Sequence, residues 1–386
     1  MTHSTSRDTL DTDTRPRRLL TFTGGGWVLV LASVLCAAVV IKSMGPRPTN
    51  SFDLSTLRVP RAMVQSVFKL EGLPSLREPE VLQQDELNLK WGRKYLVPKD
   101  RVIGVHLNGE ARCYPIRMLN WHEVIDDVVG GQPILITFHG PCDSAVVFDR
   151  RLDDRTLEFG HSGMVCNGNL LFYELAKDRP LEERSLFYQL RGEAVSGPLA
   201  GRVLRKLPCE LVAYADWMER YPNSGIVPGY PTLMQKNYQK RAYDAYLAKK
   251  ELQFEVSPLP PSTDPHHLFD PIIAVERRGP DGAVRRRVLF GDELKTQTGG
   301  DGTCAVEVFP GETIEFEVRP GETNQEISNI RAVLPRHGTD IAVFYSRYFA
   351  WYAADHVAIP GTAPSDVPSA TESGPAKTEE PAAGDR

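Results

Sequence analysis

The residues best suited to chemistry lie in two short stretches near the middle of the chain. His139 and Cys142 stand three residues apart in TFHGPCDSAVVFDR, at the end of an expected strand. The next stretch, GHSGMVC, repeats this spacing with His161, Met164 and Cys166. Imidazole nitrogen, thiolate and thioether sulfur are donors that soft and borderline metal ions accept. The spacing therefore predicts a site where nitrogen and sulfur ligands converge, without indicating a reaction.

Copper or zinc is the cofactor that this donor set favours. Two histidines with cysteine and methionine suit copper, whereas histidine and cysteine alone also suit zinc. Structural interpretations stay open beside this one. His139 would cap a turn, His161 would end a strand, Met164 would pack in the core, and Cys142 with Cys166 would form a disulfide.

A cysteine nucleophile is a further hypothesis for the same stretch. Cys142 would be activated if His122 or His139 approached it in the fold, because an imidazolium stabilises a neighbouring thiolate. His122, Glu123 and Asp143 are the polar residues expected around the site. They would orient metal ligands or supply acid and base groups. His122 is also explained as a core residue bonded to a backbone carbonyl.

The segments that must position these residues are mainly β. Asn108-Gly109 and Gly130-Gly131 each separate two apolar runs, which is the strongest local signal of a hairpin. Asn167-Gly168 supplies another turn before LLFYE, and SAVVFDR is expected to pair with LEFG. The predicted class is therefore α+β and mainly β, built from antiparallel hairpins.

Short helices are expected to close each half of the folded part. ELVAYADWMERY has apolar residues at helical spacing and is followed by Pro222. A similar aromatic segment, AVFYSRYFAWYAADH, stands near residue 356, and PIIAVERRGPDGAVRRRVL resembles RVIGVHLNGEARCYPI. The chain is thus expected to hold two similar β units, with chance likeness between hairpins as the alternative.

A transmembrane helix is predicted near the N-terminus. WVLVLASVLCAAVVI contains no charge and, extended back to Leu19, gives about 23 residues, close to the roughly 20 that a bilayer requires. Arg15, Arg17 and Arg18 precede this run and only Lys42 and Arg47 follow it, which places the N-terminus in the cytoplasm and the main domain in the periplasm. A cleaved signal peptide is the alternative.

Composition excludes some classes of partner and fits a folded domain. Hydrophobic residues make up 41% of the chain and the net charge is -5, which fits a folded domain. The sequence contains no long basic run that could neutralise phosphates, so nucleic acid is not an expected partner. Five cysteines follow the expected anchor, so they cannot all pair within one chain. The expected organisation is a cytoplasmic leader at 1–18, the transmembrane helix at 19–41, a linker and entry segment at 42–100, a first β unit at 101–222, a connection at 223–268, a second β unit at 269–356 and a disordered tail at 357–386.

Three motifs in the same order resemble one bacterial family. NWHE at residues 120–123, TFHGPCDSAVVFDR and SGMVCNGNLLFYE are similar to domain of unknown function 3179, from about Arg101 through Pro222 and more thinly to His356. The resemblance implies an extracytoplasmic domain attached to a signal or anchor, and no established activity. The family's typical C-P-L-C is here His139-Gly140-Pro141-Cys142. If both versions share one function, metal coordination survives this departure and dithiol exchange does not. Loss of the ancestral activity in this member is the alternative.

The leading hypothesis is a membrane-anchored extracytoplasmic protein that binds copper or zinc or performs a metal-dependent redox step. The site is centred on His139 and Cys142, with help from His161 and from Met164 or Cys166. The alternative is a scaffold module that binds an envelope protein, and a cysteine-dependent enzyme is third. The sequence does not indicate the substrate or the oligomeric state.

Overall fold

The computed structural model describes residues 51–92, 94–230, 238, 242–279, 283–319, 330–334 and 340–357. The predicted leader and transmembrane helix, and the predicted tail from residue 358 on, lie outside these ranges. Within them, no helix is long and apolar enough to span a bilayer. The described residues all belong to one compact unit.

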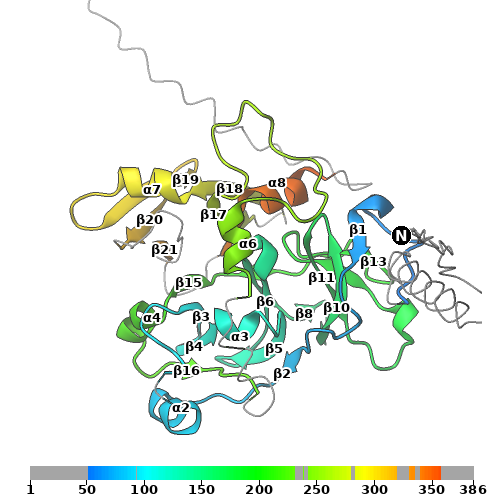
Figure 1. Ribbon diagram of the computed structural model, residues 1–386, viewed down its shortest axis with the longest axis horizontal. Coiled ribbons are helices and arrows are strands. Elements are labelled where there is room, and N and C mark those ends of the chain that lie inside the picture. The colour runs from blue at the N-terminus through cyan, green and yellow to red at the C-terminus, as the bar shows by residue number, and fades with distance from the viewer. Residues whose placement is uncertain are drawn as a thin grey trace, which may run out of the picture. The chain divides into compact units, whose positions relative to one another are not determined.

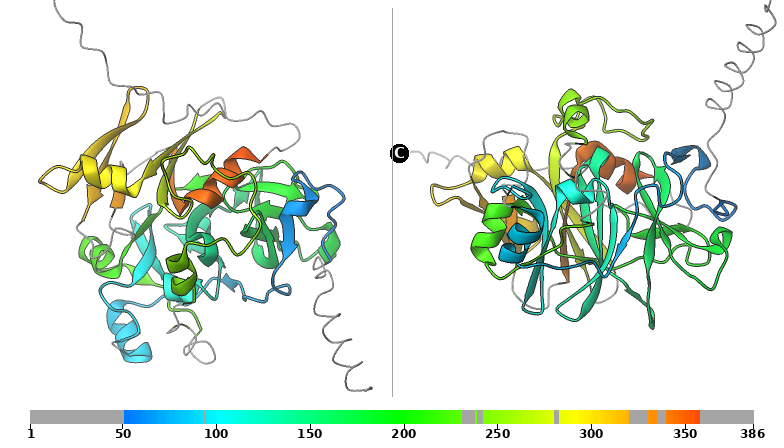
Figure 2. Two further views of the ribbon diagram at one scale, coloured as in Figure 1. Left: turned by 45° about the horizontal axis from the view of Figure 1, so that its top comes forward. Right: turned by 60° about the horizontal axis from the view of Figure 1, so that its bottom comes forward.

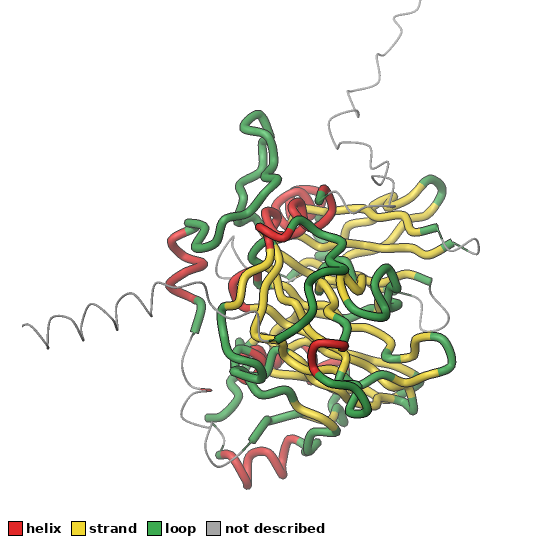
Figure 3. The backbone as a smooth tube through the Cα atoms, turned by 90° about the vertical axis from the view of Figure 1, so that its right-hand side faces the viewer, coloured by secondary structure: helices red, strands yellow, loops and turns green. Residues whose placement is uncertain are grey.

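Strands dominate this unit, and its helices are short (Figure 3). The predicted mainly β class is therefore confirmed. The largest sheet has eight strands and includes the strand that ends at His139. In sheet order it contains β18 (Val284–Phe290), β17 (Pro271–Arg278), β22 (Ile341–Arg347), β7 (Ser144–Asp149), β6 (Gln132–His139), β5 (Val124–Val129) and β2 (Leu76–Arg77), with β14 (Lys206–Leu207) paired to β7.

Both faces of the eight-stranded sheet are covered. Along β6, Ile134, Ile136 and Phe138 pack in one apolar core, while Leu135 packs in a second core on the opposite face. Because side chains alternate along a strand, His139 lies on the same face as Leu135. The end of β6 therefore directs this histidine toward the second core.

A five-stranded sheet supplies most of the other wall of the second core. Its strands β10 and β11 form a hairpin through the turn Asn167-Gly168, where both residues have positive φ. Pairing shifts between His161 and Met164, so a bulge interrupts β10. In sheet order the strands are β1 (Val64–Ser66), β10 (Phe159–Cys166), β11 (Asn169–Glu174), β12 (Leu186–Tyr188) and β13 (Glu193–Ser196) (Figure 1).

Smaller sheets and short helices surround these two layers. The strands are β15 (Glu210–Ala213), β3 (Arg101–Leu107), β4 (Glu110–Pro115) and β16 (Gly225–Ile226) in a four-stranded sheet, β19 (Thr303–Phe309), β20 (Glu312–Val318) and β21 (Ile330–Val333) in a three-stranded sheet, and the pair β8 (Arg151–Leu152) and β9 (Arg155–Thr156). The α-helices are α2 (Gln84–Trp91), α3 (Ile116–Leu119), α4 (Tyr214–Arg220), α6 (Asp244–Lys249), α7 (Gly291–Gln297) and α8 (Tyr348–His356). The 3-10 turns are η1 (Arg61–Met63), η2 (Gly140–Cys142) and η3 (Leu181–Glu183).

Three of the predicted turns join paired strands. Asn108-Gly109 connects β3 to β4, Gly130-Gly131 connects β5 to β6, and Asn167-Gly168 connects β10 to β11. The expected pairing of SAVVFDR with LEFG is wrong, because β7 pairs with β6, β14 and β22. The segment that begins at Phe159 instead pairs with β11 and β1.

The two predicted closing helices are partly strand. Residues 210–213 form β15 before α4 begins, and residues 341–347 form β22 before α8 begins. Strands of the predicted first and second β units share the eight-stranded sheet, because β22 pairs with β7 as well as with β17. Figure 2 shows α8, in orange-red, beside this sheet, with the yellow-orange β19 and β20 at one edge. A duplication of the two units stays a prediction.

Candidate functional site

A buried carboxylate, Glu123, lies between two histidines. Nδ1 of His139 is 3.1 Å from both of its oxygens, and Nε2 of His161 is 3.2 Å from Oε2. Glu123 immediately precedes β5, His139 ends β6, and His161 lies at the bulge of β10. The two layers that enclose the second core therefore each contribute a histidine to one acid group.

Hydrogen bonds determine where the protons of His161 lie. Its Nδ1 accepts the backbone N–H of Gly163 at 3.1 Å, so Nε2 must carry the proton that it donates to Glu123. A histidine that ligates a metal needs a free lone pair on the ligating nitrogen. His161 is thus arranged to donate a hydrogen bond to the Glu123 carboxylate. It is not arranged to bind a metal ion between its ring and that carboxylate.

His139 faces an oxygen acceptor from each ring nitrogen. Nδ1 points to Glu123, and Nε2 is 3.1 Å from the carbonyl oxygen of Gly168. Only a doubly protonated ring donates to both. Burial by itself raises the pKa of Glu123, but the charge of His139 and the hydrogen bonds from both histidines outweigh it and lower that pKa to about 2. The pair is therefore a buried imidazolium and carboxylate.

The thiol of Cys142 shares an acceptor with His139. Its Sγ donates to the carbonyl oxygen of Gly168 at 3.1 Å, the same distance at which that oxygen accepts from Nε2 of His139. Cys142 is fully buried, and burial raises its pKa. Sulfur and imidazole are thus neighbours around one carbonyl, with the thiol held neutral.

Met164 and Cys166 lie in the apolar part of the second core. Both are almost completely buried, and burial raises the pKa of Cys166 to about 12. Cys142 belongs to the same core, yet Cys142 and Cys166 are free thiols here, so the disulfide considered for them is not formed. In the described ranges, no group of three or more His, Cys, Asp or Glu side chains has the arrangement of a metal site.

His122 belongs to a separate hydrogen-bonded chain. Nδ1 donates to the carbonyl of Pro74 at 2.6 Å, and Nε2 accepts from the hydroxyl of Tyr238 at 2.6 Å. That hydroxyl in turn accepts the backbone N–H of Tyr230. Burial lowers the pKa of His122. The structure thus matches the core interpretation, in which this residue bonds a backbone carbonyl.

Aromatic rings cover the site on two sides. A Cβ at Gly140 would lie 2.1 Å from the ring of Tyr243, which precedes α6, so this ring rests directly on the turn that carries Cys142. On the other side, the half-exposed ring of Phe68 lies with its centroid 6.2 Å from that of His161. His139 and His161 are both almost completely buried.

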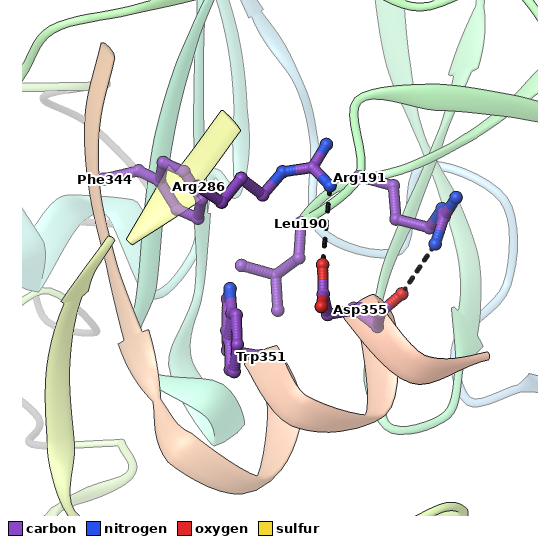
Figure 4. Close-up of a pocket in the computed structure, with 7 residues that line it drawn as sticks. Leu190, Arg191, Arg286, Phe344, Trp351 and Asp355 are labelled. Carbon is purple, nitrogen blue, oxygen red and sulfur yellow. Dashed lines mark hydrogen bonds and ion pairs between the residues drawn. The ribbon is translucent and has the colours of Figure 1, made fainter. Parts of the chain in front are cut away.

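A small cavity lies elsewhere, between the end of β12 and α8. Its lining includes Leu190, Trp351 and Phe344, and Arg286 pairs there with Asp355 (Figure 4). Its volume is about 10 Å³, the space that one water molecule needs. This cavity is too small for a substrate and does not include the carboxylate between the histidines.

Comparison with known families gives one match. Residues 70–359 match the model of the protein of unknown function DUF3179. The chain belongs to this family. No curated protein and no solved structure matches it. The DUF3179 match extends from before β2 to beyond α8, so it includes every side chain of the site.

His139 hydrogen-bonds the Glu123 carboxylate through Nδ1 and the Gly168 carbonyl through Nε2, two contacts that a cysteine thiol at this position could not make together. Glu123 was expected only as a surrounding group, whereas the structure places it at the centre. The available signal was NWHE, because a carboxylate next to an apolar strand needs a buried partner. No feature of the sequence predicts that the Gly168 carbonyl accepts hydrogen bonds from His139 and Cys142.

Proposed function

We propose that this member of the family is a thiol-dependent enzyme that acts on an electrophilic carbon such as a carbonyl. Cys142 is the nucleophile, His139 becomes the base once its Nε2 proton has passed to water, and Glu123 orients the imidazole. His161 stabilises the carboxylate from the opposite side. The observation that carries the proposal is the Gly168 carbonyl, which Sγ of Cys142 and Nε2 of His139 both approach to 3.1 Å.

Cys142, His139 and Glu123 follow one another as a nucleophile, a base and an orienting acid do in thiol-dependent enzymes. In such sites the base lies within reach of the nucleophile through one nitrogen, and the other nitrogen is held by a carboxylate. His139 has this second contact, at 3.1 Å from Glu123. A purely structural role would be served by neutral apolar groups, because burying an ion pair costs several kcal/mol in desolvation.

The reaction balances with the groups present and water. His139 first loses its Nε2 proton to water. The thiol proton of Cys142 then moves to that nitrogen and the sulfur attacks the carbonyl carbon of the substrate. The leaving group departs with the proton from His139, and a thioester remains. Water then attacks the thioester, His139 takes a proton from it, and the acid product leaves as the thiol is restored.

Alkylation of the cysteines tests this assignment without a known substrate. We expect iodoacetamide to modify Cys142 faster than Cys166, which is equally buried and belongs to the same core. His139→Asn removes the base and should lower the ratio of the two rates by about tenfold or more. Peptide mass spectrometry measures both rates in one sample, so general loosening of the core is detected at Cys166.

His356→Asn is the matched control, because His356 is an exposed residue on α8. It should leave the ratio of labelling rates unchanged. If His139→Asn also leaves the ratio unchanged, His139 does not activate Cys142 and the proposed function is wrong.

Soft-metal binding is a second candidate, favoured by one specific observation. Cys142, Met164 and Cys166 pack within the same buried core, and two thiolates with a thioether suit copper(I). Zinc is less favoured, since the proton on His161 leaves that ring no free lone pair toward Glu123. Copper analysis of the untagged protein and of Cys166→Ser separates the two candidates, because equal copper content removes this one.

We also propose that the folded unit is held at the outer face of the cell membrane by the apolar run before residue 42. The support is the sequence alone, an uncharged run flanked by unequal numbers of basic residues. The whole chain should sediment with membranes, and a chain beginning at Pro48 should not. Equal sedimentation of the two would contradict the proposal.

A further inference from the structure

Asp143, directly after Cys142, has an unusual backbone. Its φ is 47° and its ψ is 36°, in the left-handed region that non-glycine residues seldom occupy. Its N–H closes the 3-10 turn η2 by donating to the carbonyl of Gly140 at 3.0 Å. The conformation reverses the chain between the turn that carries Cys142 and the start of β7.

The carboxylate of Asp143 joins two distant strands. Oδ1 accepts from Arg101 at 2.9 Å and Oδ2 from Arg347 at 2.8 Å. Arg101 begins β3, and Arg347 ends β22. The exposed fraction of the side chain is 4% for Asp143, 11% for Arg347 and 22% for Arg101, so the contact with Arg347 is the better shielded from solvent. Arg347 also donates to the carbonyl of Phe269 at 3.0 Å.

We infer that the Arg101, Asp143 and Arg347 side chains form a clamp that positions Cys142 against His139, which makes Asp143 a positioning residue of the proposed enzyme. The inference rests on the proposed function. The carboxylate and the thiol belong to adjacent residues, so a displacement of the Asp143 carboxylate displaces Sγ of Cys142 through one short turn. Two guanidinium groups from different sheets fix that carboxylate in direction as well as in distance.

The direction in which Cys142 reactivity changes when Asp143 is replaced distinguishes a positioning role of Asp143 from an effect of its charge. Burial raises the pKa of Cys142 most, and the negative charges of Glu123 and then Asp143 raise it further. If Asp143 acted only through its charge, removing it would make Cys142 more reactive. If it positions the thiol, removing it makes Cys142 less reactive toward iodoacetamide, because His139 no longer meets the sulfur.

The test uses Asp143→Gly and Asp143→Asn with the labelling ratio of Cys142 to Cys166. Glycine adopts the left-handed backbone freely and asparagine tolerates it, so neither substitution strains the turn. We expect both to lower the ratio by about tenfold, as small displacements of reacting groups do. Arg347→Lys should lower the labelling ratio less than Arg347→Met does, since lysine keeps a positive charge beside the Asp143 carboxylate.

Each outcome has a distinct meaning. A raised ratio in both Asp143 variants, or an unchanged one, overturns the clamp while leaving the effect of His139→Asn intact. If His139→Asn does not change the ratio of the Cys142 and Cys166 labelling rates, the enzyme proposal itself is wrong. Equal ratios for Arg347→Lys and Arg347→Met would also contradict the clamp.

Discussion

At the scale of single residues, the site depends on which hydrogen-bonding partners the two histidines have. His161 can donate only from Nε2, because Gly163 donates to its other nitrogen. His139 has an acceptor on each side. Glu123 therefore receives hydrogen bonds from both rings, and its ionised form is strongly favoured even though it is buried.

Glu123→Gln should lower the free energy of unfolding by about 3 kcal/mol at neutral pH, because it leaves a buried charge on His139 without its partner. The folded-state pKa of Glu123, about 2, lies below its ordinary value of 4.5. Its stabilisation is thus present above about pH 4.5 and is lost as the pH falls toward 2.

Urea denaturation between pH 7 and pH 2.5 measures this effect. The variant should lose less stability than the natural protein over the acid part of this range. Glu80→Gln changes a half-exposed carboxylate and is the control, with little expected loss. Identical acid dependence for Glu123→Gln and the natural chain would show that Glu123 is not the ionised partner of His139.

The sequence indicated the histidines and Cys142 more directly than it indicated Glu123. Spacing within one short stretch identifies His139 with Cys142. Glu123 is 16 residues before His139, and the two meet because β5 and β6 pair in a register that brings Phe138 N–H to the carbonyl of Glu123. Register of this kind depends on the whole hairpin.

At the scale of elements, turn chemistry made the hairpins predictable. Asn108 and Gly109 both have positive φ, as their turn requires, and they connect β3 to β4. The switch from β15 to α4 was not predictable in the same way. Leu211 and Val212 fit an apolar helix face as well as a strand, and only pairing with β3 decides between them.

Two glycines of the β3–β4 hairpin should respond differently to alanine. A Cβ at Gly104 would lie 2.2 Å from the ring of Trp217, whereas a Cβ at Gly109 meets no atom within 4 Å but requires a φ of +85°. We expect Gly104→Ala to cost about 2–3 kcal/mol through overpacking and Gly109→Ala about 1 kcal/mol through backbone strain. Chemical denaturation measures both, and a larger cost at Gly109 would contradict the packing of α4 on β3.

At the scale of the described unit, the two predicted β units are joined through shared strands and buried charges. β22 lies between β17 and β7 in the eight-stranded sheet. Lys206 of β14 donates to Glu276 of β17 at 2.6 Å, and both side chains are buried. Burial lowers the pKa of Lys206 to about 8, while Lys206 and Arg286 outweigh burial and lower that of Glu276 to about 2.

A fragment of residues 48–268 should therefore not fold. It lacks β17 and β22, so β7 loses a paired neighbour, Lys206 loses Glu276, and Asp143 loses Arg347. Comparison of the fragment with residues 48–386 by amide hydrogen exchange is the measurement. A protected, cooperative fragment would show that the second half is an independent addition.

Alternation of apolar residues and turn residues predicted strands in each half of the chain. It did not predict that strands of both halves pair in one eight-stranded sheet.

The most direct test of the account is whether Cys142, His139 and Glu123 act as one unit. The measurement is the labelling rate of Cys142, relative to Cys166, in Glu123→Gln, His139→Asn and the double variant. Groups that act together are not additive, so the double variant should be no slower than His139→Asn alone. Independent, multiplying effects of the two substitutions would contradict the account.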